Sequence, residues 1–222
     1  MRLLLISSST VHGYGFLDHP EPEIRSFLGV ARRVAFVPFA AHDHEAYTDK
    51  VRERLAGMDL DVVSLDDLDR AEAIFVGGGN TFRLLKTLYD RDLLDVIRTR
   101  VRDGLPYLGS SAGTVIAGPT MRTTNDMPIV YPPSFESFGF VDFQINPHYV
   151  DPDPSSTHKG ETREDRIREF HEENEAAVVG LREGSALRVD DGTTTVLGEK
   201  SARIFRRGID PVEVDPGKIE LA

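Results

Sequence analysis

The segment "YLGSSAGTVIAG", residues 107–118, contains a serine with the spacing expected of a nucleophile. Gly109, Ser111 and Gly113 form a G-x-S-x-G pattern, in which the central serine stands on a sharp turn between a strand and a helix. Such a turn exposes the hydroxyl at the carboxyl end of the strand, where open α/β sheets bind ligands. Small residues also recur where a helix merely packs closely, so an isolated match is weak. Apolar segments precede and follow the G-x-S-x-G pattern in this chain. We therefore favour Ser111 as a nucleophile.

A serine nucleophile requires a general base, which is normally a histidine. His148 in "INPHY" directly follows a strand-like stretch and a proline that fixes the local backbone. His12 and His19 lie near an irregular segment and His171 lies on a polar helical one, so we expect these three at the surface in solvent. His148 is therefore the candidate base.

The acid that would orient this base is not fixed by the residue pattern. Asp126 in "TTNDMP" and Glu183 in "GLREGS" both lie in turns that follow apolar or strand-like residues. An acid in such a turn is usually just solvated. Both residues remain candidates at this point.

A second glycine turn, "VGGGNTF" at residues 76–82, also joins a strand to a helix. It does not fit the dinucleotide-binding fingerprint, because Phe82 stands where the third glycine belongs. Its glycines can instead expose backbone N–H groups beside a helix N-terminus, which suits an anion or a developing oxyanion. We expect the N–H groups of Gly79 and Ala112 to be the two donors.

The stretch "HKGETREDRIREF", residues 158–170, puts a cation where a helix disfavours one. Thr162 and Asp165 have the spacing of a helix cap, so Arg163 falls at the first helical position, next to the positive end of the helix dipole. An arginine there suits a bound carboxylate. The alternative is that Glu161, Glu164 or Asp165 balances it on a solvated face.

Composition argues against several other kinds of site. The chain of 222 residues has no cysteine, which excludes disulfides, thiolate metal sites and a cysteine nucleophile. His42 and His44 have an H-x-H spacing, but no third ligand is evident nearby, and we expect no metal site. A net charge of −11 argues against nucleic acid and anionic membranes as partners. The first apolar run is too short for a signal-peptide core, so we expect a cytoplasmic protein.

Short apolar runs rich in valine, isoleucine and leucine alternate with helical patterns along the first half of the chain. The strand candidates are 3–7, 34–39, 62–65, 73–79 and 106–111, and the clearest helical patterns are 45–57, 81–103 and 163–174. Near-continuous apolar strands between helices indicate a mostly parallel sheet covered on both faces. Residues 177–208 alternate short strands with glycine turns, as antiparallel hairpins do. We expect a three-layer α/β fold in one domain, residues 1–222.

Taken together, these motifs resemble peptidase E, the α-aspartyl dipeptidase family of serine peptidases. The resemblance extends over nearly the whole chain, through the ordered blocks "LLLISSST", "FVPFA", "EAYTDK", "FVGGGNTFRLLK", "YLGSSAG", "RTTNDMPIV", "QINPHY", "HKGETREDRIRE" and "VVGLREGSALRV". It implies a fold related to that of class I glutamine amidotransferases, with serine in place of their cysteine. It also implies hydrolysis of dipeptides that begin with aspartate, without a metal or a cofactor.

The resemblance further implies a role for each candidate residue. Ser111 would be the nucleophile, His148 the base and Glu183 the orienting acid, with Asp126 a rival or an additional site residue. Members of the family often have a bulky aromatic residue at the position of Ser110, and the segment "AAHDHEAY" differs from the corresponding loop.

The resemblance to the family also identifies backbone donors and substrate contacts. It implies that Gly79 and Ala112 donate to the oxyanion, and that Asn80 and Arg163 contact the substrate.

Three alternative functions have to be weighed against this one. The related cyanophycinases share the serine turn and cleave at β-linked aspartate. A noncatalytic small-anion-binding module would use "GGGNT" to cradle phosphate and would leave Ser111 structural. An α/β-hydrolase esterase is disfavoured, because that fold places its base after the acid and no histidine follows His171.

Overall fold

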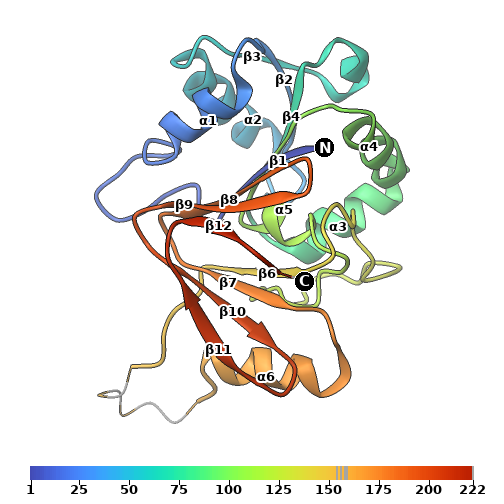
Figure 1. The fold of residues 1–222 in the computed structure, drawn as a ribbon. Coiled ribbons are helices and arrows are strands. Elements are labelled where there is room, and N and C mark those ends of the chain that lie inside the picture. The colour runs from blue at the N-terminus through green and yellow to red at the C-terminus, as the bar shows by residue number, and fades with distance from the viewer. Residues whose placement is uncertain (154, 156, 158–159, 222) are drawn as a thin grey trace.

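The computed structural model describes residues 1–153, 155, 157 and 160–221, and its strands form two sheets (Figure 1). The larger sheet has eight strands in the order β12 (Gly217–Ile219), β9 (Thr193–Gly198), β8 (Ser185–Asp190), β1 (Arg2–Ile6), β5 (Tyr107–Ser110), β4 (Ala73–Val76), β2 (Arg33–Val37) and β3 (Asp61–Val63). The smaller sheet has four strands in the order β11 (Ile209–Val214), β10 (Ala202–Arg206), β7 (Val178–Leu181) and β6 (Gln144–Pro147).

The larger sheet combines two kinds of strand pairing. Strands β1, β5, β4, β2 and β3 pair in parallel, and all five carry the apolar runs identified in the sequence. Strands β8, β9 and β12 extend the sheet beyond β1 with antiparallel pairs. The hairpin of β10 and β11 in the smaller sheet is also antiparallel. The protein therefore has a mixed α/β fold, with its antiparallel hairpins in the C-terminal part.

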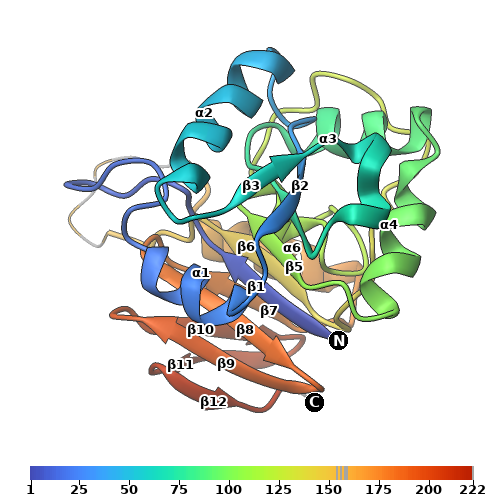
Figure 2. The same ribbon diagram turned by 90° about the horizontal axis from the view of Figure 1, so that it is seen from above.

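Helices pack on both faces of the larger sheet (Figure 2). They are α1 (Glu21–Leu28) and α2 (His44–Ala56) on one face, and α3 (Thr81–Asp90), α4 (Leu93–Arg102) and α5 (Ala112–Val115) on the other, with a 3₁₀ turn at Leu65–Arg70. Helix α6 (Arg163–Glu173) packs instead on the smaller sheet. Alternate residues of β1 separate the two cores, because successive side chains of a strand point to opposite faces. Leu4 and Ile6 pack with α1 and α2, whereas Leu3 and Leu5 pack with α3, α4 and the smaller sheet.

The structure differs from the sequence expectations in three helices. The helical pattern over 81–103 is two helices, because Asp92 takes a left-handed backbone conformation with φ of 54° and starts a new helix. The segment after Ser111 is helical for only four residues. Helix α1 was not identified from the sequence, and it begins beside Pro20 and Pro22, which are tolerated in a first helical turn. No helix among residues 1–153, 155, 157 and 160–221 is long and apolar enough to cross a membrane.

Strand β4 and helix α5 approach each other unusually closely at Gly113. A Cβ atom at this glycine would lie 2.1 Å from the carbonyl oxygen of Val76, which is backbone and cannot rotate away. This close approach positions the turn at Ser111 against the end of β4. The glycine that completes the G-x-S-x-G pattern is thus required by packing.

We expect Gly113→Ala to lower the free energy of unfolding by about 2 to 3 kcal/mol, because forced overpacking must displace backbone. Gly57→Ala is the matched control, since its Cβ would meet its nearest neighbour at an ordinary 3.4 Å. Chemical denaturation of both variants measures the difference. Equal stability of the two variants would contradict the packing argument.

Candidate active site

Ser111 lies at the turn between β5 and α5 in a strained backbone conformation. Its φ is 51° and its ψ is −107°, a region that residues other than glycine rarely occupy. Its N–H donates to the carbonyl of Ile6 at 3.1 Å, and the hydroxyl of Thr114 donates to the same carbonyl at 2.7 Å. The neighbouring Ser110 is fully buried. The turn therefore holds the Ser111 side chain at the carboxyl edge of the larger sheet.

His148 follows β6 in the smaller sheet and also has a positive φ, of 53°. Its N–H donates to Ser7 Oγ at 2.9 Å, and the Ser7 hydroxyl in turn donates to the carbonyl of Leu181 at 2.7 Å. Ser7 directly follows β1 and Leu181 ends β7. One buried serine thus connects the two sheets where the histidine leaves its strand.

Three side chains from separate parts of the chain form a continuous hydrogen-bonded line. Ser111 Oγ lies 2.9 Å from His148 Nε2, and His148 Nδ1 lies 2.7 Å from Glu183 Oε1. The tautomer with its proton on Nδ1 satisfies both contacts, since Nε2 then accepts from the serine and Nδ1 donates to the carboxylate. This is the order of groups that can take a proton from a serine during nucleophilic attack.

The glycine turn after β4 lies directly beside Ser111. A Cβ atom at Gly78 would be 3.0 Å from Ser111 Cβ and 3.7 Å from its Oγ. Gly78 N–H donates to Tyr47 Oη at 3.1 Å, and burial raises the pKa of Tyr47 to about 12, so this phenol stays neutral. Within the described part of the chain, the N–H groups of Gly79 and Ala112 make no hydrogen bond to the backbone or to a side chain. Both are free to receive an anion.

Asp126 does not reach His148. Its Oδ2 accepts from the Thr81 N–H at 2.7 Å and from the Thr81 hydroxyl at 2.6 Å, at the start of α3. Of the two acids that the sequence left open, the structure brings Glu183 to the histidine and Asp126 to the helix beside the glycine turn. Asn80 caps the same helix through its side-chain oxygen, which accepts from Arg83 N–H at 3.1 Å.

Arg163 begins α6, and its capping box is formed by Thr162 and Asp165, as the sequence indicated. Burial lowers the pKa of the guanidinium from its ordinary value, and the positive charge of Arg166 lowers it further, whereas the negative charge of Asp126 opposes this. No ion pair joins Arg163 to an acid among the residues that the structure describes. Glu164 pairs with Arg168 and Arg203 rather than with Arg163. A partly buried arginine thus lies near Asp126 without a carboxylate partner.

An ion-pair cluster behind the histidine was not identified from the sequence. Arg182, which is only 14% exposed, donates to both carboxylate oxygens of Asp151 at 2.8 and 2.6 Å and also pairs with Glu213. Its guanidinium lies 5.6 Å from the ring centre of Tyr149. Arg182 precedes Glu183 and Tyr149 follows His148, so the cluster holds both segments in place. Its partners are distant in sequence, so no local pattern could have indicated it.

Among the described residues, the other histidines divide between exposed and buried positions, and His158 lies outside those residues. The expectation of a solvated His171 was wrong, because this side chain is buried and its Nε2 lies 3.1 Å from the carbonyl oxygen of Ala176. His19 is half-buried, contrary to expectation, whereas His12 is exposed. His42 and His44 bind no common partner, and the described residues contain no group of three or more histidines and acids that could hold a metal ion.

Comparisons with known proteins place the chain among peptidases. The chain is 55% identical over 224 residues to peptidase E of Streptomyces coelicolor, covering 98% of this chain and 92% of that protein. It is 46% identical over 231 residues to the Drosophila melanogaster protein named "Probable alpha-aspartyl dipeptidase", covering 100% and 93%. The crystal structure of a peptidase from an acI-B1 actinobacterium shares the fold, with a TM-score of 0.73 at 17% identity over 99% of this chain and 96% of that one.

The family model described as Peptidase family S51 matches residues 3–197, which include Ser111, His148 and Glu183. This match covers most of the chain, and the relatives above match almost all of it. The chain therefore belongs to peptidase family S51.

Proposed function

We propose that this protein is a serine-dependent dipeptidase that hydrolyses peptides of the form Asp-X, where X is the second residue. The observation that carries the proposal is the hydrogen-bonded line from Ser111 Oγ through His148 to Glu183. Relatives named peptidase E and alpha-aspartyl dipeptidase, which align over nearly the whole chain, support the choice of substrate.

In this proposal Ser111 Oγ attacks the peptide carbonyl carbon while its proton passes to His148 Nε2. The N–H groups of Gly79 and Ala112 stabilise the negative charge that develops on the carbonyl oxygen. The imidazolium then gives its proton to the departing amine of X, which leaves an aspartyl ester on the serine. Water, deprotonated by the same imidazole, hydrolyses that ester and restores the serine.

Glu183 acts as the orienting acid in this scheme. Its carboxylate accepts the Nδ1 proton of His148, which fixes the tautomer with a free Nε2 and stabilises the imidazolium. Asp126 acts as a positioning residue, because its hydrogen bonds to Thr81 support the first turn of α3 next to the glycine turn. No metal or cofactor takes part in any step, so a chelator should leave turnover unchanged.

Arg163 is the proposed partner of the aspartyl side chain. Its guanidinium is partly buried near Asp126, and a carboxylate of the substrate would supply the counter-charge that it lacks within the described residues. A carboxylate there would also lie at the N-terminus of α6, which the helix dipole favours. Asn80 keeps one amide hydrogen for the substrate after its other donates to the carbonyl of Met127 at 2.9 Å.

We further propose that residues 1–222 form one domain of the class I glutamine amidotransferase type, with three layers around the parallel strands. Support comes from the helices on both faces of the larger sheet and from the serine turn at the carboxyl end of β5. The smaller sheet contributes the histidine and the glutamate, so it belongs to the same catalytic unit.

Ser111→Ala should abolish hydrolysis of Asp-Leu, with a fall in kcat of at least about 10³-fold, because the acyl-enzyme cannot form. Release of leucine measures the rate, and circular dichroism checks that the variant is folded. Glu-Leu, Asn-Leu and β-linked Asp-Leu run beside it should be poor substrates of the unmodified protein. Cleavage of the β-linked peptide alone would favour a cyanophycinase-like activity, and binding of small anions without any turnover would favour a binding module.

Replacing the two acids separates their roles. Glu183→Gln should lower kcat about 10³-fold with little change in stability, because an amide cannot stabilise the imidazolium. Asp126→Asn should instead lower the free energy of unfolding by about 1 kcal/mol, as expected for a weakened helix cap, with a smaller loss of kcat. Steady-state kinetics and denaturation of both variants provide the comparison. A larger kcat loss in Asp126→Asn than in Glu183→Gln would reverse the assignment.

Arg163→Met should lower kcat/KM for Asp-Leu about 100-fold, mainly through KM, since a charge-assisted hydrogen bond to the aspartyl carboxylate is lost. The preference for Asp-Leu over Asn-Leu should fall at the same time. Arg166→Met, three residues further along α6 and exposed, is the matched control. An unchanged Asp-to-Asn preference in Arg163→Met would show that another residue recognises aspartate.

A further inference from the structure

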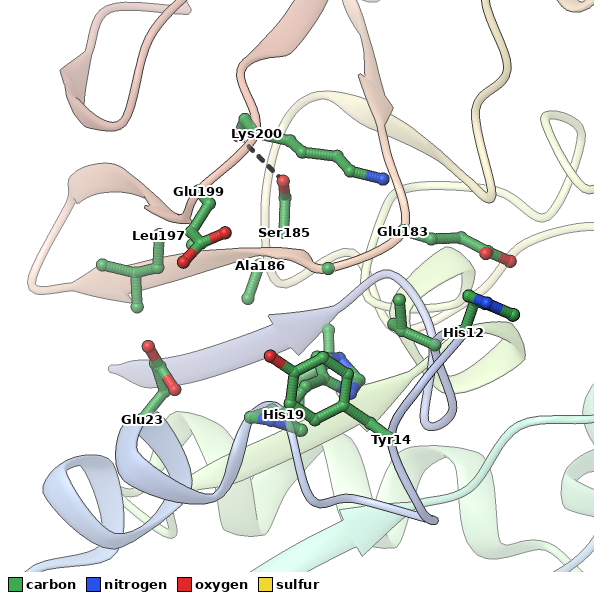
Figure 3. A pocket seen from close by; sticks show the side chains of 15 residues that line it. His12, Tyr14, His19, Glu23, Glu183, Ser185, Ala186, Leu197, Glu199 and Lys200 are labelled. Carbon is green, nitrogen blue, oxygen red and sulfur yellow. Dashed lines mark hydrogen bonds between the residues drawn. The ribbon is translucent and has the colours of Figure 1, made fainter.

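A cavity of about 430 Å³ has Glu183 in its wall (Figure 3). Its walls come from the end of β1, the segment that follows it, the start of α1, and strands β8 and β9. This volume lies within the range of pockets that bind small molecules. The proposed reaction steps assign no role to this cavity.

The position of the cavity relates it directly to Ser111. In the larger sheet β5 lies between β4 and β1, so the two sides of Ser111 are distinct. The glycine turn, Asn80 and Asp126 are on the β4 side, where the aspartyl residue is proposed to bind. The cavity is on the β1 and β8 side, and Ile6, whose carbonyl accepts the Ser111 N–H, forms part of its wall. A dipeptide with its aspartyl residue on the β4 side would extend its second residue toward the cavity.

The wall nearest the sheet is apolar. Ile6, Ala186 and Leu197 contribute aliphatic side chains, and Ala186 pairs with Leu197 across β8 and β9. An aliphatic chain of the substrate would lose water on entering this space, which favours binding.

The end of the cavity farthest from Glu183 has polar atoms that lack partners. Figure 3 shows Glu23, Glu199 and Leu197 together at this end. Glu23 Oε2 and both ring nitrogens of His19 are buried and make no hydrogen bond within the described structure. Burial lowers the pKa of His19, although the charges of Glu23, Asp18 and Glu183 act in the opposite direction, and no ion pair joins His19 to Glu23 among the described residues. Buried polar atoms of this kind normally have a partner, and here a donor with a positive charge would serve.

Lys200 is the lysine of the cavity wall, and no acid within 4 Å pairs with it among the described residues. Its backbone carbonyl accepts from the Ser185 hydroxyl at 2.8 Å, which holds this part of the wall in place. Figure 3 shows its side chain extending in the direction of Glu183. Its ammonium group can therefore meet a carboxylate that enters from the catalytic side.

We propose that this cavity binds the second residue of the Asp-X substrate and selects a long side chain with a cationic end, lysine or arginine. The inference rests on the proposed dipeptidase function. The aliphatic part of the side chain lies against Ile6, Ala186 and Leu197, its charged end meets Glu23, and the peptide carboxylate meets Lys200. Recognition of that carboxylate also favours a dipeptide over a substrate that lacks the carboxylate at this position.

The test compares Asp-Lys with Asp-norleucine, whose side chain is unbranched and aliphatic but uncharged, and with Asp-Glu. The unmodified protein should give a kcat/KM about tenfold higher for Asp-Lys than for Asp-norleucine, and higher still relative to Asp-Glu. Glu23→Gln should reduce the Asp-Lys to Asp-norleucine ratio to about one. Glu169→Gln, which changes an exposed glutamate of α6 outside the cavity, should keep the ratio.

A second comparison tests the carboxylate contact. Asp-Lys amide lacks the terminal carboxylate and should have a KM about fivefold or more above that of Asp-Lys. Lys200→Ala should remove this difference, whereas Lys218→Ala, on β12 outside the cavity, should retain it.

Three outcomes would overturn the inference. An Asp-Lys to Asp-norleucine ratio near one in the unmodified protein would show that the cavity does not select a cation. An equal fall in both rates in Glu23→Gln would show a merely structural role for this residue. Failure to hydrolyse even aspartyl p-nitroanilide and Asp-Gly, which place no side chain in the cavity, would instead reject the dipeptidase function and this inference with it.

Discussion

The hydrogen bonds at the carboxyl end of β1 are the constraint on which the site depends. The carbonyl of Ile6 accepts from the Ser111 N–H, and the next residue, Ser7, accepts from the His148 N–H and donates to the carbonyl of Leu181. One short segment therefore fixes the backbone of the serine, the backbone of the histidine and the end of the strand that leads to Glu183. The two sheets meet at this point, and the distance between nucleophile and base follows from how they meet.

The backbone conformations of Ser111 and His148 are unfavourable in isolation. Each has a positive φ, which side chains with a Cβ rarely adopt, and such strain persists only where the surroundings impose it. Buried hydrogen bonds impose it here, together with the close approach of α5 to β4 at Gly113. The contacts that shape the site therefore also offset the free-energy cost of this strain. They hold the serine and the histidine within hydrogen-bond distance of each other before any substrate binds.

Charge is distributed unequally around Ser111. On the β4 side, Arg163 lies near Asp126 and is available for an acidic group. On the β1 and β8 side, the cavity has several carboxylates and one lysine in its wall. The overall charge of −11 says nothing of this division, because a net charge sums over the whole chain and does not record where each charge lies or which charges pair, as Arg182 does with Asp151 and Glu213. Under the proposed roles of Arg163 and of the cavity, this asymmetry gives a dipeptide a defined direction across the site.

The sequence by itself determined the parallel strands, the serine turn and the candidacy of His148, because each depends on local patterns of apolar runs, glycines and proline. It also located the cap of α6 and the position of Arg163 in it. Only the tertiary structure decided between Glu183 and Asp126 as the residue in contact with His148, since both occupy similar turns. The cluster around Arg182 and the buried groups of His19 and Glu23 also depend on contacts between distant segments. A local sequence pattern indicates the backbone conformation of its own segment. The hydrogen-bond or ion-pair partner of a side chain is determined only when distant segments pack together.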